Sequence, residues 1–140
     1  MKYEVTDGKC IIPDGATRIE EGAFAECESL QSIVIPDSVK EIEAYAFLEC
    51  WSLQAISIPY GVTKIGRSVF GGCTSLQSIE IVTQEKEPDL SLERIEYLLQ
   101  ALSEYSKVIS LRVPIGCGYA YRHYPAFEGK FKTIIADIDA

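Results

Sequence analysis

Apolar residues recur along this chain at a fixed interval of 23 residues. Three consecutive units start at Pro13, Pro36 and Pro59 and run to Ile35, Ile58 and Ile81. The same residue types stand at the same offsets in each unit: Ile19, Ile42 and Ile65; Phe24, Phe47 and Phe70; Cys27, Cys50 and Cys73; Leu30, Leu53 and Leu76; Ile33, Ile56 and Ile79. Such a period is typical of a solenoid, in which each coil buries its apolar face by stacking on its neighbours.

Each unit is predicted to contain one strand, a turn and a second extended segment. In the first unit, residues 33–35 alternate in the manner of a strand, and Pro36 ends it because proline has no N–H for a ladder. A second extended segment is expected at 39–42, and 44–47 suits one helical or 3₁₀ turn. Equivalent strands of successive units should therefore pair side by side in a parallel sheet.

Both ends of the repeat array need a cap. Residues 3–6 and 9–12 flank Asp7-Gly8, a strong hairpin signal, so residues 1–12 are interpreted as an N-terminal cap hairpin. Its second arm falls at the repeat position of a strand, and its first arm could cover the edge of the sheet. Residues 114–140 are interpreted as a C-terminal cap, with a short last strand at 134–135. Its bulky closing residues are Tyr119, Tyr121, Tyr124, Phe127 and Phe131.

The spacing breaks after residue 81. Pro114 follows Pro59 by one unit of 23 residues and one of 32. The long repeat, 82–113, carries an apolar stripe at helical spacing, which predicts a helix over 91–105 with Ser91 as its N-cap. The helix is expected either to cap the solenoid or to dock a partner. The chain is predicted to be a single domain, 1–140, with three full repeats over 13–81.

The repeat motif resembles a known family. The segment Leu53-Gln54-Ala55-Ile56-Ser57-Ile58-Pro59, followed by Ile65 and by residues 69–76 with Phe70, Cys73 and Leu76, is similar to the BspA-type leucine-rich repeat of bacteria. The clean match covers 10–81, and a looser one covers 108–135. The resemblance implies an α/β, β-rich solenoid: a right-handed leucine-rich-repeat superhelix with a parallel sheet on one face. It also implies protein binding, often on bacterial surfaces.

The composition bears on the class of partner and on the cellular location. The chain has 140 residues, 47% of them hydrophobic, with a formal charge of −8. Because nucleic-acid binding depends on clustered Lys and Arg, this charge disfavours a nucleic-acid partner. The sequence contains no run of 18 apolar residues, so no membrane span is predicted. The first residues contain no apolar stretch typical of a signal peptide, so the expected location is cytoplasmic if Met1 is the native start. It is the cell surface or the exterior if a leader has been removed.

The five cysteines and the single histidine are the residues considered for catalysis or metal binding. Cys27, Cys50 and Cys73 recur at one repeat position, as packing residues do, so they are interpreted as reduced and structural. No Cys-x-x-Cys pair points to zinc, and a thiol or metal site on this column is the minor alternative. Cys117 and His123 lack a third group to orient them. No catalytic residue, metal or cofactor is therefore expected.

The outer side of the predicted sheet remains as a binding surface. If Ile33 and Ile35 point inward, Ser32 and Val34 point outward. The period then predicts an outer column of Ile11, Val34, Ser57, Glu80 and Arg112, beside a second column of Lys9, Ser32, Ala55, Ser78 and Ser110.

Trp51 and Tyr60 stand at variable repeat positions and are further candidates for contact. The candidate protein-contact residues are Val34, Trp51, Ser57, Tyr60, Glu80 and Arg112. The leading hypothesis is a non-enzymatic protein-binding module. The alternative is a self-associating scaffold, a homo-oligomer joined through its end strands or through Trp51 and Tyr60.

Overall fold

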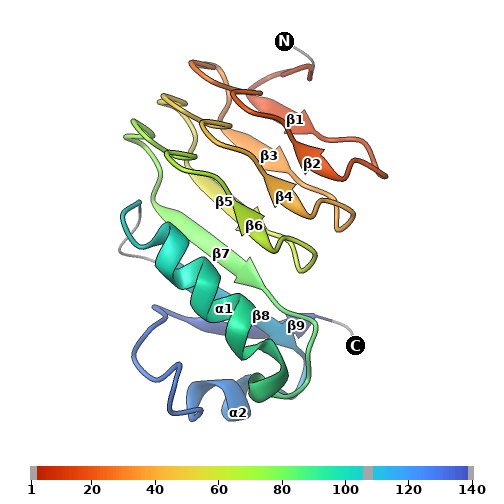
Figure 1. Ribbon diagram of the computed structural model, residues 1–140, viewed down its shortest axis with the longest axis vertical. Helices are drawn as coiled ribbons and strands as arrows, with labels where there is room; N and C mark the ends of the chain where they lie inside the picture. The colour runs from red at the N-terminus through yellow and green to blue at the C-terminus, as the bar shows by residue number, and fades with distance from the viewer. Residues whose placement is uncertain (1–2, 106–108, 139–140) are drawn as a thin grey trace.

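The computed structural model describes residues 3–105 and 109–138 and shows a β-rich solenoid of stacked coils. Figure 1 shows the coils following one another from the N-terminus to the C-terminus along the long axis. One side carries β1 (Lys9–Ile11), β3 (Ser32–Val34), β5 (Ala55–Ile58), β7 (Ser78–Val82), β8 (Ile109–Pro114) and β9 (Ile134–Ile138). The other side carries β2 (Arg18–Ile19), β4 (Glu41–Ile42) and β6 (Lys64–Ile65), then the helices α1 (Pro88–Leu102) and α2 (Gly118–Arg122).

All the named strand pairs are parallel, as the repeat predicts. One side pairs in the order β1-β3 and β5-β7-β8-β9, and the other pairs in the order β2-β4-β6. The first side is thus divided into two sections between β3 and β5. A backbone hydrogen bond from Gln54 N to Gln31 O, 3.2 Å long, crosses the division.

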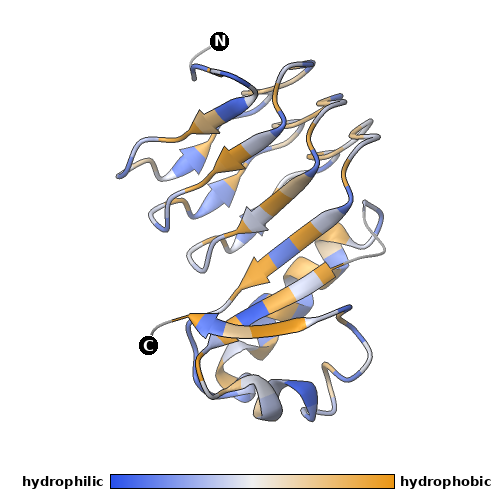
Figure 2. Ribbon diagram, turned by 180° about the vertical axis from the view of Figure 1, so that it is seen from behind, coloured by the Kyte–Doolittle hydropathy of each residue, from blue (hydrophilic) through white to orange (hydrophobic). Residues whose placement is uncertain are grey.

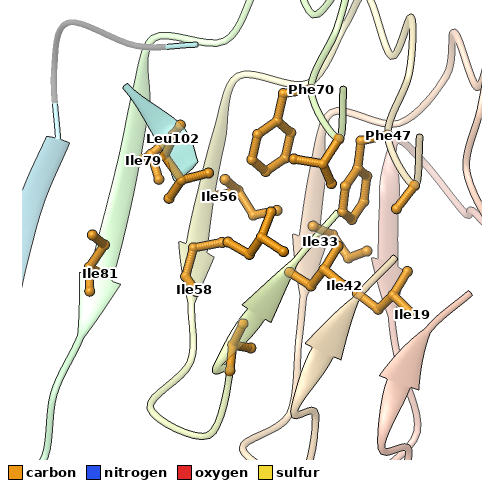
Figure 3. Packing of buried hydrophobic residues seen from close by; sticks show 14 of the residues in the cluster. Ile19, Ile33, Ile42, Phe47, Ile56, Ile58, Phe70, Ile79, Ile81 and Leu102 are labelled. Carbon is orange, nitrogen blue, oxygen red and sulfur yellow. The ribbon is translucent and has the colours of Figure 1, made fainter. Parts of the chain in front are cut away.

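The interior is built from aligned columns, and the phenylalanine column is confirmed. The ring centroids of Phe24 and Phe47 lie 5.3 Å apart, and those of Phe47 and Phe70 lie 5.5 Å apart, with the rings close to parallel. Tyr3 stacks on Phe24 at one end, and Tyr105 meets Phe70 edge-on at the other. Figure 3 shows Phe47 and Phe70 side by side above the isoleucine side chains of the strands. Five rings therefore form one continuous aromatic column, which is closed at both ends by tyrosine.

The turns between the two sides also stack. The N–H groups of Gly22, Phe24 and Glu26 donate to the carbonyls of Ala44, Ala46 and Leu48, and the second turn repeats the pattern onto the third. This arrangement requires a left-handed residue at two positions of each turn. The first position is Gly22, Tyr45 or Ser68, and the second is Glu26, Glu49 or Gly72. One helical or 3₁₀ turn was the expectation, and the left-handed residues are the difference.

Helix α1 begins and ends earlier than the predicted 91–105. It starts at Pro88, since proline at the first position loses no helical hydrogen bond, and it ends at Leu102. The prediction of Ser91 as the N-cap is wrong, because Ser91 lies one turn inside the helix and is buried. Its hydroxyl is 2.7 Å from Thr83 Oγ1 and 3.1 Å from the hydroxyl of Tyr121. The polar side chain of Ser91 suggested a cap, but its hydroxyl instead joins a buried contact among three hydroxyl groups.

A tight turn precedes β1 at the N-terminal end, and β9 is the last strand at the C-terminal end. Asp7 and Gly8 both have positive φ, and Thr6 and Lys9 exchange two backbone hydrogen bonds around them, which makes the tight turn of a hairpin. The first arm then leaves β1, and Tyr3 stacks on Phe24. At the other end, the short last strand expected at 134–135 is extended to Ile138 as β9.

Gly66→Ala should destabilise the fold strongly, because a Cβ there would lie 2.2 Å from Ala44 N in the neighbouring coil. Backbone cannot yield as a flexible side chain can, so a loss of about 3 kcal/mol in the free energy of unfolding is expected. Urea denaturation of both proteins measures it.

Gly129→Ala is the matched control for that change. Nothing lies within 4 Å of a Cβ at Gly129, but its φ of +74° is strained for alanine, so the expected loss is about 1 kcal/mol. Equal losses in the two variants would show that the coils do not approach as closely at Gly66 as described.

Candidate functional site on the outer sheet face

The outer sheet face is the side of β1, β3, β5, β7, β8 and β9 that turns away from the helices. Figure 2 shows this side in front, with α1 lying behind the strands. It carries the predicted outer column. In the strand register Ile11 lies opposite Val34, and Ser57 lies opposite Glu80, as the period predicts.

The position of Arg112 in that column is wrong by two residues. Arg112 lies opposite Val82, and Glu80 lies opposite Ser110, so Ser78 and Ser110 are not neighbours in the second column either. Val82 stands where the earlier units have Pro36 and Pro59. Because valine keeps its N–H, β7 continues past the usual end, and β8 pairs two residues further along. A shift of two residues leaves Arg112 on the same face, because side chains alternate with a period of two.

Arg112 still reaches Glu80, diagonally across the strands. Its Nε lies 2.8 Å from Oε1 of Glu80, as an ion pair without the alignment of a hydrogen bond. Its Nη2 donates to Oε2 of Glu80 at 3.2 Å, and its Nη1 donates to Asp137 at 3.0 Å. Ser57 donates to Oε1 of Glu80 at 3.1 Å. Three of the candidate contact residues therefore form one polar network over β5, β7 and β8, which Asp137 completes from β9.

The N-terminal part of the same face is apolar and exposed. Val34 is 58% exposed, and Ile11 beside it is 74% exposed. Ile11 belongs to the predicted outer column but was not among the candidate contact residues. The repeat places it at the same outward position as Val34, so its exposure could have been predicted. Between this apolar pair and the polar network, Ser32, Ala55 and Ser57 are small and exposed.

Trp51 and Tyr60 do not form one patch. Trp51 is 48% exposed in the turn before β5, and Tyr60 follows the other end of that strand. The Tyr60 hydroxyl donates to Glu85, and its ring lies 5.3 Å from the Arg94 guanidinium. Arg94 in turn donates to the carbonyls of Pro59, Val62 and Val82. Tyr60 is thus fastened to α1 and is not a free contact residue.

Helix α1 closes the open edge of the β2-β4-β6 sheet. The hydroxyl of Tyr97 accepts from Ile65 N at 3.0 Å and donates to Ile65 O at 3.3 Å. These two backbone groups of β6 have no further strand to pair with, so the tyrosine takes the place of one. Burial lowers the pKa of Arg94 to about 10, which reflects how far its charge is withdrawn from water. The capping role that the sequence allowed for the helix is thus visible in these contacts.

Thiols of the cysteine column donate hydrogen bonds to backbone carbonyls of the preceding coil. Cys50 Sγ donates to Phe24 O, and Cys73 Sγ donates to Phe47 O, each at 3.0 Å, so each thiol ties its coil to the previous one. The neighbouring Cys73 thiol and burial both raise the pKa of Cys50, and burial raises that of Cys10. All five cysteines are free. Within residues 3–105 and 109–138, no group of three or more His, Cys, Asp or Glu could hold a metal ion.

Cys117 and His123 lie at the two ends of α2 and do not meet as a pair. His123 Nδ1 lies 2.9 Å from Tyr119 O, and its ring stacks on Tyr119. Cys117 Sγ lies 4.0 Å from Ile115 O. No helix in the described part of the chain combines the length and apolar character of a membrane span.

The family model that matches this chain is the BspA type leucine rich repeat region, which aligns with residues 5–95 in six copies. No curated protein matches the chain. Among solved structures, a leucine rich cell surface protein of Faecalibacterium prausnitzii is 41% identical over 51% of this chain and 18% of its own, with a TM-score of 0.49.

Two other solved structures are similar. The pneumococcal vaccine antigen PcpA is 19% identical, with 93% of this chain and 36% of its own covered and a TM-score of 0.59. The T. pallidum leucine rich repeat protein is 16% identical over 98% of this chain and 96% of its own, with a TM-score of 0.33. PcpA supports the fold. The chain spans about a fifth of the first structure's length and about a third of PcpA's.

Tyr60→Ala should cost stability, whereas Trp51→Ala should not. Loss of the Tyr60 ring removes its contact with Arg94 and the hydrogen bond to Glu85, for which about 2 kcal/mol is expected. Truncation of the exposed Trp51 should change the free energy of unfolding by less than about 0.5 kcal/mol. Paired denaturation curves decide it, and a larger loss at Trp51 than at Tyr60 would contradict these placements.

The thiols should differ in reactivity in the folded protein. Cys10, Cys27 and Cys50 are buried, so they should react with a thiol reagent only as fast as the protein unfolds, whereas the half-exposed Cys117 should react first. Mass spectrometry of the modified peptides at increasing times measures the order, with Cys117→Ser as the control. Prompt modification of Cys50 would contradict its burial and its hydrogen bond to Phe24.

Proposed function

The chain belongs to the BspA-type leucine-rich repeat family, and from that premise we propose that it is a non-enzymatic module that binds a protein on its outer sheet face. The observation that carries the proposal is the uncovered face itself. Six parallel strands present their outer side chains there, while α1, α2 and the second sheet lie on the opposite side. A repeat scaffold of this kind offers a broad, rigid surface whose outer positions can vary without cost to the core.

The chemistry of the face divides the expected contact into two parts. Ile11 and Val34 supply exposed apolar area, which favours contact with apolar side chains of a partner. The network of Ser57, Glu80, Arg112 and Asp137 supplies charge, and arginine is one of the residue types enriched among the residues that dominate such contacts. The guanidinium is already held in place by two carboxylates, so a partner would meet a fixed group and lose little side-chain entropy on binding.

The proposed surface keeps four residues of the sequence-based one, adds two and drops two. Val34, Ser57, Glu80 and Arg112 share the outer sheet face, and Ile11 and Asp137 join them. Tyr60 is held by α1, and Trp51 lies in the turn before the start of β5. Trp51 is therefore at most a residue of the rim.

A photo-crosslinking amino acid placed at Val34 tests the proposal. The protein is incubated with secreted and surface proteins of the source bacterium and of its surroundings, and crosslinked products are identified by mass spectrometry. A defined partner should be trapped at Val34, be displaced by excess unlabelled protein, and lose at least about tenfold in affinity when Arg112→Ala is combined with Val34→Asp.

The matched control places the same crosslinker at Leu90, which is exposed on α1, away from the face. Partners trapped equally at both positions, or a partner unaffected by the double substitution, would contradict binding on the outer sheet face.

A further inference from the structure

The stacked turns of the first three coils, residues 21–26, 44–49 and 67–72, direct their N–H groups the same way. In the first two turns, two N–H groups donate to two carbonyls of the following turn, and these carbonyls stand two residues apart. Phe24 and Glu26 donate to Ala46 and Leu48, and Phe47 and Glu49 donate to Val69 and Gly71, at 2.6–2.9 Å. The peptide dipoles of the turns are therefore aligned, with their positive N–H ends toward the C-terminal end of the solenoid.

The third turn has no fourth turn to receive its N–H groups. Phe70 and Gly72 stand at the two donor positions, and neither N–H has an acceptor within residues 3–105 and 109–138. Phe70 is also buried, with 2% of its surface exposed. Buried backbone N–H groups without a partner are rare in folded proteins, because the loss of water is then not compensated. The stack thus ends in two donors that lack acceptors.

Helix α1 replaces the fourth coil only in part. Tyr97 pairs with the backbone of Ile65 in β6, and the hydroxyl of Tyr105 receives hydrogen bonds from the backbone of Ser68 and Val69. Figure 1 shows the three turns in a row and the end of α1 next in that row. The side chains of the helix therefore meet the backbone of the third coil as far as Val69 and leave the later part of the turn open.

A cavity of about 400 Å³ lies at this open part of the turn. Phe70, Gly72 and Thr74 line it from the third turn, and Glu104 and Tyr105 line it from the segment after α1. Since the N–H groups of the earlier turns point toward the next coil, those of Phe70 and Gly72 point toward the space that this cavity occupies.

The charges around the cavity disfavour an anion as its occupant. Glu104 is the one charged residue in the described part of the chain that lines it, and Glu49 of the preceding coil lies against Gly72. Arg67 lines the adjoining cavity, but its guanidinium lies over the ring of Tyr45 in the preceding coil, 5.8 Å from the ring centroid. A carboxylate or phosphate would meet like charge here. Neutral carbonyl oxygens would not.

We propose that the third turn is a second protein-binding site, which takes a peptide segment of a partner protein in the place of a fourth turn. Two carbonyl groups of the partner, two residues apart, accept from the N–H groups of Phe70 and Gly72. A lysine or arginine of the same segment enters the cavity and pairs with the carboxylate of Glu104.

The spacing inside the chain is the reason for a peptide. Ala46 and Leu48 already show that carbonyls two residues apart in a neighbouring backbone segment fit such a donor pair. Addition of a peptide to open backbone groups is also a recurring mode of recognition. A second copy of the chain does not fit, because Tyr3 stacks on Phe24 and covers the first turn. The site lies at the turns and not on the outer sheet face, so this proposal does not depend on the proposed function.

Amide hydrogen exchange of the purified chain, followed by NMR, tests whether the two donors are free. The N–H of Phe70 should exchange at least about tenfold faster than those of Phe24 and Phe47, and the N–H of Gly72 should exchange faster than that of Glu49 by the same factor. These residues hold the same position in bonded turns, so the chain supplies its own controls. Equal protection in all three turns would overturn the proposal, because the donors would then be bonded within the chain.

A displayed library of random twelve-residue peptides, selected on the folded full chain, tests the binding. Peptides rich in lysine or arginine should be enriched, bind with a Kd of roughly 10–100 μM, and shift the amide signals of Phe70 and Gly72. Glu104→Gln should weaken the binding about threefold. No enriched peptide, or an enriched peptide that leaves both amide signals unchanged, would overturn the proposal. The same result follows if acetate or inorganic phosphate alone shifts these signals, because the site would then be one for anions.

Thr74→Trp blocks the cavity with a side chain that the repeat already accepts. Trp51 holds the same position in the second coil, so the variant should fold, and it should bind the selected peptide at least about tenfold more weakly. Glu28→Trp, at that position of the first coil, is the matched control and should bind within about twofold of the wild type. The combination of Arg112→Ala and Val34→Asp should leave peptide binding unchanged, so the two proposals fail separately. Undiminished binding to Thr74→Trp would overturn this one.

Discussion

Registered stacking of one coil on the next is the constraint on which every other feature depends. At each 23-residue step the same contacts recur: a phenylalanine ring on a phenylalanine ring, a cysteine thiol on the carbonyl of the previous phenylalanine, and turn N–H groups on turn carbonyls. None of these contacts forms within a single unit, so a coil gains its stability only from neighbours. The aromatic column needs a terminating ring at each end, which Tyr3 and Tyr105 provide.

The stacking of the coils does not require particular side chains on the outer sheet face. Inward positions are fixed by the columns, whereas Ile11, Val34 and Ser57 touch nothing that the core requires. Helix α1 closes the opposite side, where Arg94 and Tyr97 satisfy backbone groups that no further strand reaches. The proposed binding surface and the capping helix therefore use different residues.

The sequence predicted what the repeat determines and missed what interrupts it. The columns of Phe24 and Cys27 and the pairing of Ile11 with Val34 follow from identical offsets in each unit, and the tight turn at Asp7 follows from the Asp-Gly pair. The partner of Arg112 could not be read from proline spacing, because Val82 replaces the proline that ends the earlier strands. Ser91 is buried inside α1 by its contact with Tyr121, which lies 30 residues away and cannot be read from the local pattern. Asp137 was likewise invisible as a partner of Arg112 until β9 was placed.

A double-mutant cycle along the aromatic column measures the stacking most directly. Phe24→Leu and Phe47→Leu, singly and together, give the coupling of two adjacent rings, and the same cycle for Phe24 and Phe70 gives that of rings two coils apart. Adjacent rings should couple by about 1 kcal/mol, and the distant pair should be additive within about 0.5 kcal/mol. Additive behaviour of Phe24 and Phe47, or equal coupling in both cycles, would show that the coils do not stack as described.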